Sequence, residues 1–152
     1  PEAGGRPAAG VERVPDRLAA RAAQAAHRAG WAEVPVGEDV VVGVDAYAPP
    51  AVERRGDRLF GREVERWTEA ARRSGTRLVF VDVPPGAAPA ALRAGAIDAY
   101  FGGFSEAALR RLVAGVPAAV KGAAGGVFAV RKGWEDVPLI RAVESLFSGS
   151  GM

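Results

Sequence analysis

Apolar runs of strand length alternate with helical segments between residues 39 and 110, and this alternation limits the possible folds more than any other feature. The strand-like runs and the helices between them follow in chain order: Asp39–Val44, helix 61–74, Arg77–Val83, helix 89–94 and Ile97–Phe101. The first run is nearly all valine, as expected of a parallel strand buried on both faces. Strands that alternate with helices predict a parallel sheet with crossover helices. Ligands bind such sheets beyond the carboxyl ends of the strands, which therefore mark where function is sought.

The rest of the chain extends this pattern. Further elements are predicted as a helix over 105–113, a strand over Gly126–Arg131 and a last helix over 136–147. Asp45–Arg55 is predicted as a loop because Pro49 and Pro50 cannot continue a ladder, and Gly115–Gly126 as a connector rich in Gly, Ala and Pro. We predict an α/β fold of three layers, a mainly parallel twisted sheet with helices on both faces.

The length of 152 residues suits one domain with a single core. We expect residues 14–147 to form one α/β lobe, with a loose segment over 1–13 and a flexible tail over 148–152. A helix over 16–29, rich in alanine and arginine, would pack on the lobe or link it to another part of a larger protein.

Composition excludes several classes of function. The chain has no cysteine and one histidine, so neither a thiolate metal site nor a disulfide framework is expected. The net charge is only +2 and no basic tract carries interleaved aromatics, which argues against nucleic-acid binding. The chain contains no run of about 18 apolar residues, the length needed to span a membrane. Nothing supplies a nucleophile–base pair, a metal cluster or a glycine-rich phosphate loop, so we expect no catalytic residues, no metal and no cofactor.

Four sequence blocks together resemble one known family. They are Gly43-Val44-Asp45 with Pro49-Pro50, then Gly61–Glu65, then Leu92, Gly95 and Ile97–Ala99, and finally Gly103-Phe104-Ser105 with Arg110. Their order and spacing are similar to those of the bacterial extracellular solute-binding proteins of amino-acid ABC importers, which have the type 2 periplasmic-binding fold. A complete member has two lobes, whereas this chain has room for one, and Gly115–Gly126 stands where a second lobe would be inserted. The resemblance is therefore to the first lobe only.

The resemblance implies a site for an amino-acid-like or small carboxylate ligand. Arg110 matches the family's bidentate carboxylate clamp, for which a planar guanidinium is suited. Ser105 would offer its hydroxyl and backbone N–H at a helix start. The other candidate ligand contacts are Asp45 and Glu63 as acceptors for an ammonium group, Tyr47 as an aromatic wall, and Gly103 and Phe104 beside the serine.

Each of these side chains also has a purely structural interpretation. Ser105 can be a helix N-cap and Arg110 a solvated helix residue. Asp45 can cap the following loop, and Glu63 suits the first turn of a helix in any protein. These alternatives stay open at the level of sequence.

Two functions follow. The first is a single-lobe solute-binding module linked to transport or sensing, extracytoplasmic (periplasmic or at the cell surface), alone or as part of a membrane protein. Its partners would be the small ligand, a membrane transporter or sensor, and a second copy that replaces the missing lobe in a homodimer. The alternative is a non-catalytic structural or dimerisation domain that keeps the lobe as a scaffold, because Ala48 and Ala51 stand where the family carries ligand-stacking aromatics.

Overall fold

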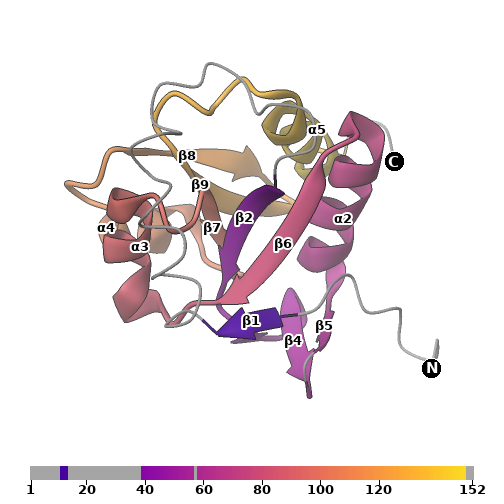
Figure 1. Ribbon diagram of the computed structural model, residues 1–152, viewed down its shortest axis with the longest axis horizontal. Coiled ribbons are helices and arrows are strands. Elements are labelled where there is room, and N and C mark those ends of the chain that lie inside the picture. The colour runs from indigo at the N-terminus through magenta and orange to yellow at the C-terminus, as the bar shows by residue number, and fades with distance from the viewer. Residues whose placement is uncertain (1–10, 14–38, 57, 150–152) are drawn as a thin grey trace.

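A computed structural model describes residues 11–13, 39–56 and 58–149 of the protein. Six strands form one sheet in the order β1-β6-β2-β7-β9-β8 (Figure 1). Their bounds are β1 Val11–Arg13, β2 Asp39–Val44, β6 Arg77–Asp82, β7 Ala99–Phe101, β8 Ala118–Ala123 and β9 Gly126–Arg131. Strands β1, β6, β2 and β7 run parallel, whereas β9 and β8 are antiparallel to their neighbours. The predicted mainly parallel sheet is confirmed.

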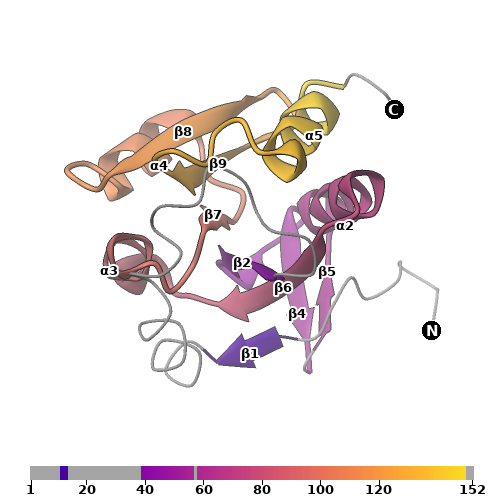
Figure 2. The same cartoon turned by 45° about the horizontal axis from the view of Figure 1, so that its top comes forward.

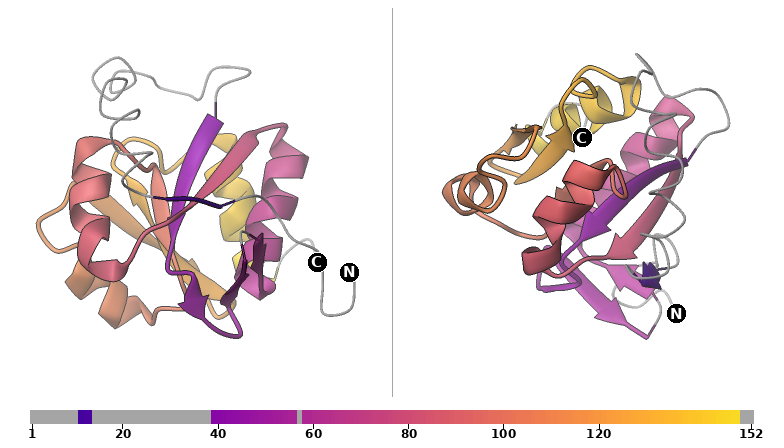
Figure 3. Two further views of the ribbon diagram at one scale, coloured as in Figure 1. Left: turned by 60° about the horizontal axis from the view of Figure 1, so that its bottom comes forward. Right: turned by 60° about the vertical axis from the view of Figure 1, so that its left-hand side comes forward.

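Helices cover both faces of this sheet. Helices α2 (Arg62–Ser74) and α5 (Pro138–Phe147) lie on one face, and α3 (Ala88–Ala94) and α4 (Glu106–Leu112) lie on the other (Figures 2 and 3). The left view of Figure 3 shows α3 and α2 on opposite sides of the central strands. The three-layer α/β fold predicted from the strand–helix alternation is therefore confirmed.

Strand β2 is central and buried on both faces, which explains its valine run. Val40, Val42 and Val44 belong to the core under α2 and α5, whereas Val41 belongs to the core under α3 and α4. Trp67 projects from α2 into the first core, where its ring stacks on Phe101 at a centroid distance of 5.4 Å. Burying apolar side chains on both faces of a strand is what a continuous apolar sequence allows and an alternating one does not.

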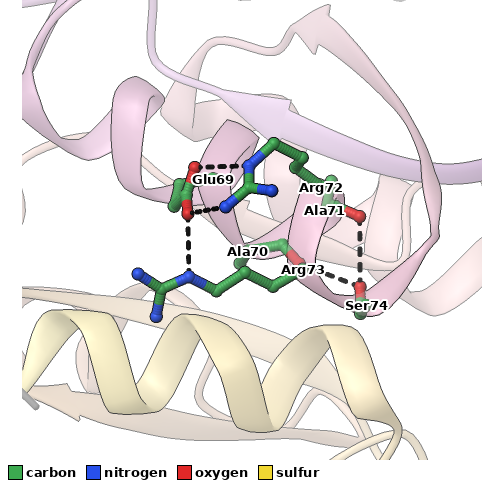
Figure 4. Close-up of polar contacts among 6 residues, drawn as sticks. All are labelled: Glu69, Ala70, Ala71, Arg72, Arg73 and Ser74. Atoms are coloured by element: carbon green, nitrogen blue, oxygen red, sulfur yellow. Dashed lines mark hydrogen bonds and ion pairs between the residues drawn. The ribbon is translucent and has the colours of Figure 1, made fainter. Parts of the chain in front are cut away.

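The exposed end of α2 is stabilised by local polar contacts (Figure 4). Glu69 accepts hydrogen bonds from the Nε atoms of Arg72 at 2.9 Å and Arg73 at 2.8 Å, and these bonds lower the pKa of Glu69 to about 2. The Ser74 hydroxyl donates to the Ala70 carbonyl at 2.9 Å. Gly75 then ends the helix in the left-handed conformation, with φ +66°, that favours glycine.

Two segments differ from the sequence prediction. The region predicted as a loop over Asp45–Arg55 contains β3 (Tyr47–Ala48) and β4 (Val52–Arg55), which join β5 (Arg58–Phe60) in a small antiparallel sheet. Pro49 and Pro50 occupy the turn between β3 and β4, so they remove no hydrogen bond from the ladder. The two prolines therefore form a turn as predicted, but the residues on either side of them form strands and not a loop.

The predicted connector Gly115–Gly126 was also wrong, because it contains strand β8. Its small residues carry no apolar alternation, and the strand forms because β9 offers a full ladder of partners from Ala118↔Arg131 to Ala123↔Gly126. Strand β1 lies within the segment 1–13 that was expected to be loose. The helix predicted over 16–29 lies outside the described residues.

In the part of the chain that the structure describes, no helix has both the length and the apolar character needed to cross a membrane.

Candidate functional site

The carboxyl ends of the parallel strands share one edge of the sheet. Strand β2 ends there at Val44 and β7 at Phe101. Strand β9 runs antiparallel to β7 with Phe101 opposite Phe128, so β9 begins at the edge where β7 ends. The segment after β7, the start of α2 and the turn of the β8–β9 hairpin therefore meet at the edge where parallel sheets bind ligands.

A hollow of about 310 Å³ lies at this edge. Three segments line it: Arg62 and Glu63 at the start of α2, Gly103–Glu106 after β7, and Ala123, Ala124, Gly126 and Val127 from the β8–β9 hairpin. Four of the seven predicted ligand contacts are among these residues, namely Glu63, Gly103, Phe104 and Ser105. The structure thus brings together residues from two of the sequence blocks, 40 positions apart in the chain between Glu63 and Gly103.

Glu63 is buried beneath this hollow, with 1% of its surface exposed. Its Oε1 accepts a hydrogen bond from the Gly103 backbone N–H at 3.4 Å. Burial raises the pKa of Glu63, and the Gly103 hydrogen bond and the charges of Arg62 and Arg66 oppose that rise. Glu63 therefore links α2 to the segment after β7. It also places a carboxyl group with a raised pKa beside the hollow.

The segment Gly103–Ser105 turns the chain from β7 into α4. Gly103 has φ +73°, which favours glycine. The Phe104 ring lies 5.7 Å from the ring of Tyr100, centroid to centroid. The Ser105 hydroxyl accepts a hydrogen bond from the Ala108 N–H at 3.1 Å, so Ser105 is the N-cap of α4.

The other three predicted contacts do not line the hollow. Asp45 follows β2, and its Oδ1 accepts from the Tyr47 N–H at 3.3 Å. The Tyr47 side chain is 70% exposed on β3. Arg110 is 59% exposed, and its Nε donates to Oε2 of Glu106 at 2.9 Å. Glu106 itself lines the hollow, so Arg110 is connected to the hollow through its ion pair with Glu106.

Sequence reasoning missed the third lining segment entirely. The hairpin residues Ala123, Ala124 and Gly126 are too small to carry a chemical signature, and they reach the site only through strand pairing. Glu106 was also missed, although its spacing of four residues from Arg110 on a predicted helix indicated an ion pair.

A second hollow, of about 330 Å³, lies along α2 beside Leu146 of α5. It is lined by Glu65, Glu69, Arg62 and Arg66, and the carboxylate of Glu69 is already paired with two arginines. Because this hollow involves no strand end, we place the candidate site at the carboxyl edge instead. Within residues 11–13, 39–56 and 58–149, no three His, Asp or Glu side chains gather in a metal-binding arrangement.

The raised pKa of Glu63 predicts how stability depends on pH. The folded state holds the Glu63 proton more tightly than the unfolded chain does. Glu63 therefore favours folding below its unfolded pKa of about 4.3, and this advantage is lost as the pH rises through the folded pKa. The variant Glu63→Gln has no such proton, so its free energy of unfolding relative to wild type should rise between pH 4 and pH 8.

Urea unfolding at a series of pH values measures this difference. Glu65→Gln, an exposed change on the same turn of α2, is the matched control. A Glu63→Gln difference that is flat with pH, or that falls as the pH rises, contradicts the prediction.

Comparison with known proteins gives matches at the level of structure. No protein-family model matches the chain, and no curated protein sequence matches it. The arginine-bound form of domain 1 from TmArgBP is 26% identical with a TM-score of 0.55, and the match covers 73% of this chain and 92% of that one. A point mutant of that domain, also arginine-bound, has the same identity and TM-score, with 90% of its chain covered. A substrate-binding protein of an ABC uptake transporter from Streptococcus pneumoniae, with bound histidine, is 20% identical with a TM-score of 0.46; 55% of this chain and 32% of that one are covered.

The fold is that of one lobe of a periplasmic-binding protein. The solved structures similar to this chain include a separate, arginine-bound single domain of which nine-tenths is matched. The predicted resemblance to the first lobe of the solute-binding family is thereby confirmed.

Proposed function

We propose that the protein is a single-lobe solute-binding module that binds a small amino acid at the carboxyl edge of its sheet. One observation carries the proposal: the chain covers 92% of a single domain whose solved structure is an arginine-bound form. A lone lobe of this fold is thus sufficient to hold an amino acid in at least that protein. The hollow between α2, the segment after β7 and the β8–β9 hairpin is where we place the ligand here.

The charges around the hollow suit a zwitterionic ligand. Glu63 and Glu106 are acceptors for an ammonium group, and Arg62 lies at the same mouth for a carboxylate. Phe104 offers an apolar surface. Charge-assisted hydrogen bonds of these kinds are the strong ones in protein–ligand recognition.

In this proposal Arg110 exchanges its partner Glu106 for the ligand carboxylate. The pair is exposed, with 59% of each side chain accessible, and such surface pairs are worth about 0–1 kcal/mol. A bidentate bond to a ligand carboxylate offsets that loss, since hydrogen bonds to charged groups contribute about 1.5–3 kcal/mol. Asp45 and Tyr47 are proposed as outer contacts on the side of the small sheet.

The same proposal covers the wider role of the protein. We infer that it has no catalytic activity, works outside the cytoplasm, and delivers or reports its ligand to a membrane transporter or sensor. The solute-binding neighbours support this role. A structural or dimerisation domain is the alternative, but such a domain needs an apolar face, and Tyr47 is the one exposed large apolar side chain among the described residues.

Isothermal titration calorimetry with L-arginine, L-histidine, L-glutamate and L-leucine tests the proposal. We expect at least one of these amino acids to bind the wild type, and Arg110→Ala to weaken that binding by about tenfold or more, because a charged contact is lost. Arg111→Ala, an exposed neighbour on the same helix, should leave affinity unchanged. If none of the four amino acids binds or shifts the melting temperature of the wild type, the proposed function is wrong.

A further inference from the structure

The hollow has two walls, which meet at one edge of the sheet. One wall is formed by the start of α2 and the segment after β7, and the other by the tip of the β8–β9 hairpin. The second wall is built from Ala123, Ala124 and the backbone around Gly126, so it adds surface without adding charge. In a two-lobed protein with the ligand between the lobes, an opposing lobe would supply such a wall.

The hairpin tip is hydrogen-bonded to α2 and α5, the two helices that lie on one face of the sheet. Gly125 donates its N–H to the Phe147 carbonyl at the end of α5, at 2.9 Å. The Gly125 carbonyl accepts from Nη1 of Arg66 on α2, at 3.2 Å. A single residue at the tip thus bonds to both α2 and α5, the helices that cover one core of the protein. Because the backbone N–H and C=O of Gly125 are both hydrogen-bonded, the tip has a defined position over the hollow.

The tip also approaches Glu63 more closely than a side chain would allow. A Cβ added to Gly126 would lie 3.0 Å from the Glu63 Cδ and Oε2 atoms, and Gly126 has φ +147°. A Cβ added to Gly125 would lie 2.4 Å from the Phe147 carbonyl oxygen. Glycine at 126 therefore lets the hairpin close against the first turn of α2, and glycine at 125 lets it close against the end of α5. Glu63 belongs to the first wall, where it accepts a hydrogen bond from Gly103, and its carboxyl group lies where a Cβ on Gly126 would meet it.

We propose that the tip of the β8–β9 hairpin, residues 122–126, completes the ligand site within one chain and takes the place of an opposing lobe. Arg66 is its positioning residue, because it does not line the hollow and acts by holding the Gly125 carbonyl. The inference rests on the proposed function and deepens it: the site needs no second copy of the protein. A wall that is already in place reduces the cost of ordering the site when the ligand arrives.

Substitutions at Gly125 and at Arg66 each displace the hairpin wall. Gly125→Ala pushes the tip away from Phe147 and keeps every charge. Its matched control is Gly86→Ala, where an added Cβ meets nothing within 4 Å. Arg66→Met removes the hydrogen bond to Gly125, Arg66→Lys keeps a donor and the charge, and Arg72→Met is the control on the exposed side of the same helix.

The measurement is calorimetric titration of each folded variant with whichever of L-arginine, L-histidine, L-glutamate and L-leucine binds the wild type most tightly, alongside circular dichroism melts and solution mass. Gly125→Ala and Arg66→Met should each weaken binding by about tenfold or more, with Arg66→Lys recovering part of the loss and both controls within about twofold of wild type. The wild type should bind as a monomer, with an affinity that does not depend on protein concentration.

The outcomes separate this inference from the proposed function. If Gly125→Ala and Arg66→Met fold and bind that amino acid as the wild type does, the hairpin does not form a wall of the site, and the solute-binding function survives. If binding strengthens as the protein dimerises, a second copy completes the site and the inference is overturned. A wild type that binds none of the amino acids overturns the proposed function, and this inference with it.

Discussion

Replacing Trp67 by alanine is expected to lower the free energy of unfolding by about 3–5 kcal/mol, the usual cost of deleting a large aromatic side chain from a core. Trp67 is fully buried and contacts two further rings, stacking on Phe101 and meeting Phe128 edge-on at 5.3 Å. These rings belong to α2, β7 and β9, so the cavity would open where the helix layer meets two strands of the sheet. Urea denaturation followed by circular dichroism measures the change.

Trp67→Phe is the matched control for this prediction. The indole N–H of Trp67 is buried and has no hydrogen-bond acceptor among the described residues, so phenylalanine removes an unsatisfied donor while it keeps a ring. We expect the phenylalanine variant to lose less than half of what the alanine variant loses. Equal losses in the two variants would mean that ring stacking is not what Trp67 contributes.

Replacing Asp98 by alanine should cost a similar amount, about 3–5 kcal/mol, because it leaves a buried charge without its partner. Asp98 is 1% exposed. Its Oδ2 accepts from the Val41 N–H at 2.9 Å and its Oδ1 accepts from Nη1 of Arg131 at 3.0 Å. The side chain therefore joins β2 to the end of β9 across β7, and its loss would strand a cation that is only 13% exposed.

A double-mutant cycle separates the charge pair from the backbone bond. Asp98→Asn keeps an acceptor for Val41 but no charge for Arg131, and Arg131→Met removes the cation. We expect Asp98→Ala to be partly rescued when Arg131→Met is added, since the double variant buries no unpaired charge. Strictly additive losses would show that the pair is not coupled.

The sequence predicted the elements that have strong apolar patterns. The valine run of β2, the stripe that contains Val64 and Trp67 in α2, and the apolar positions of α5 all lie in the core as expected. Strands β3, β4 and β8, with the sequences YA, VERR and AAVKGA, were missed because they are short and have no period-two pattern of apolar residues. What makes β8 a strand is the ladder offered by β9, and that is a tertiary contact.

Some residues of the candidate site were predicted from the sequence and others were not. Glu63 and Gly103–Ser105 were predicted as ligand contacts from the family resemblance, and the parallel topology places them together at the edge where the hollow lies. The hairpin wall could not be predicted, because glycine and alanine act there through closeness of the backbone. Arg110 was predicted from the resemblance as a carboxylate clamp, and in the structure its guanidinium instead forms a local ion pair with Glu106 at 2.8 Å.

Strand β8 also determines how the sheet ends. Among the described strands it pairs with β9 alone, so the backbone groups along its outer side have no strand partner. Free edges of this kind recruit strands from other molecules and seed aggregation, and proteins blunt them with lysine and glycine. Lys121 stands on this edge, paired with Glu144 of α5 at 3.3 Å, and Gly122 follows it. The strand that leads into the hairpin tip therefore also carries the charge that discourages the sheet from growing into a neighbouring molecule.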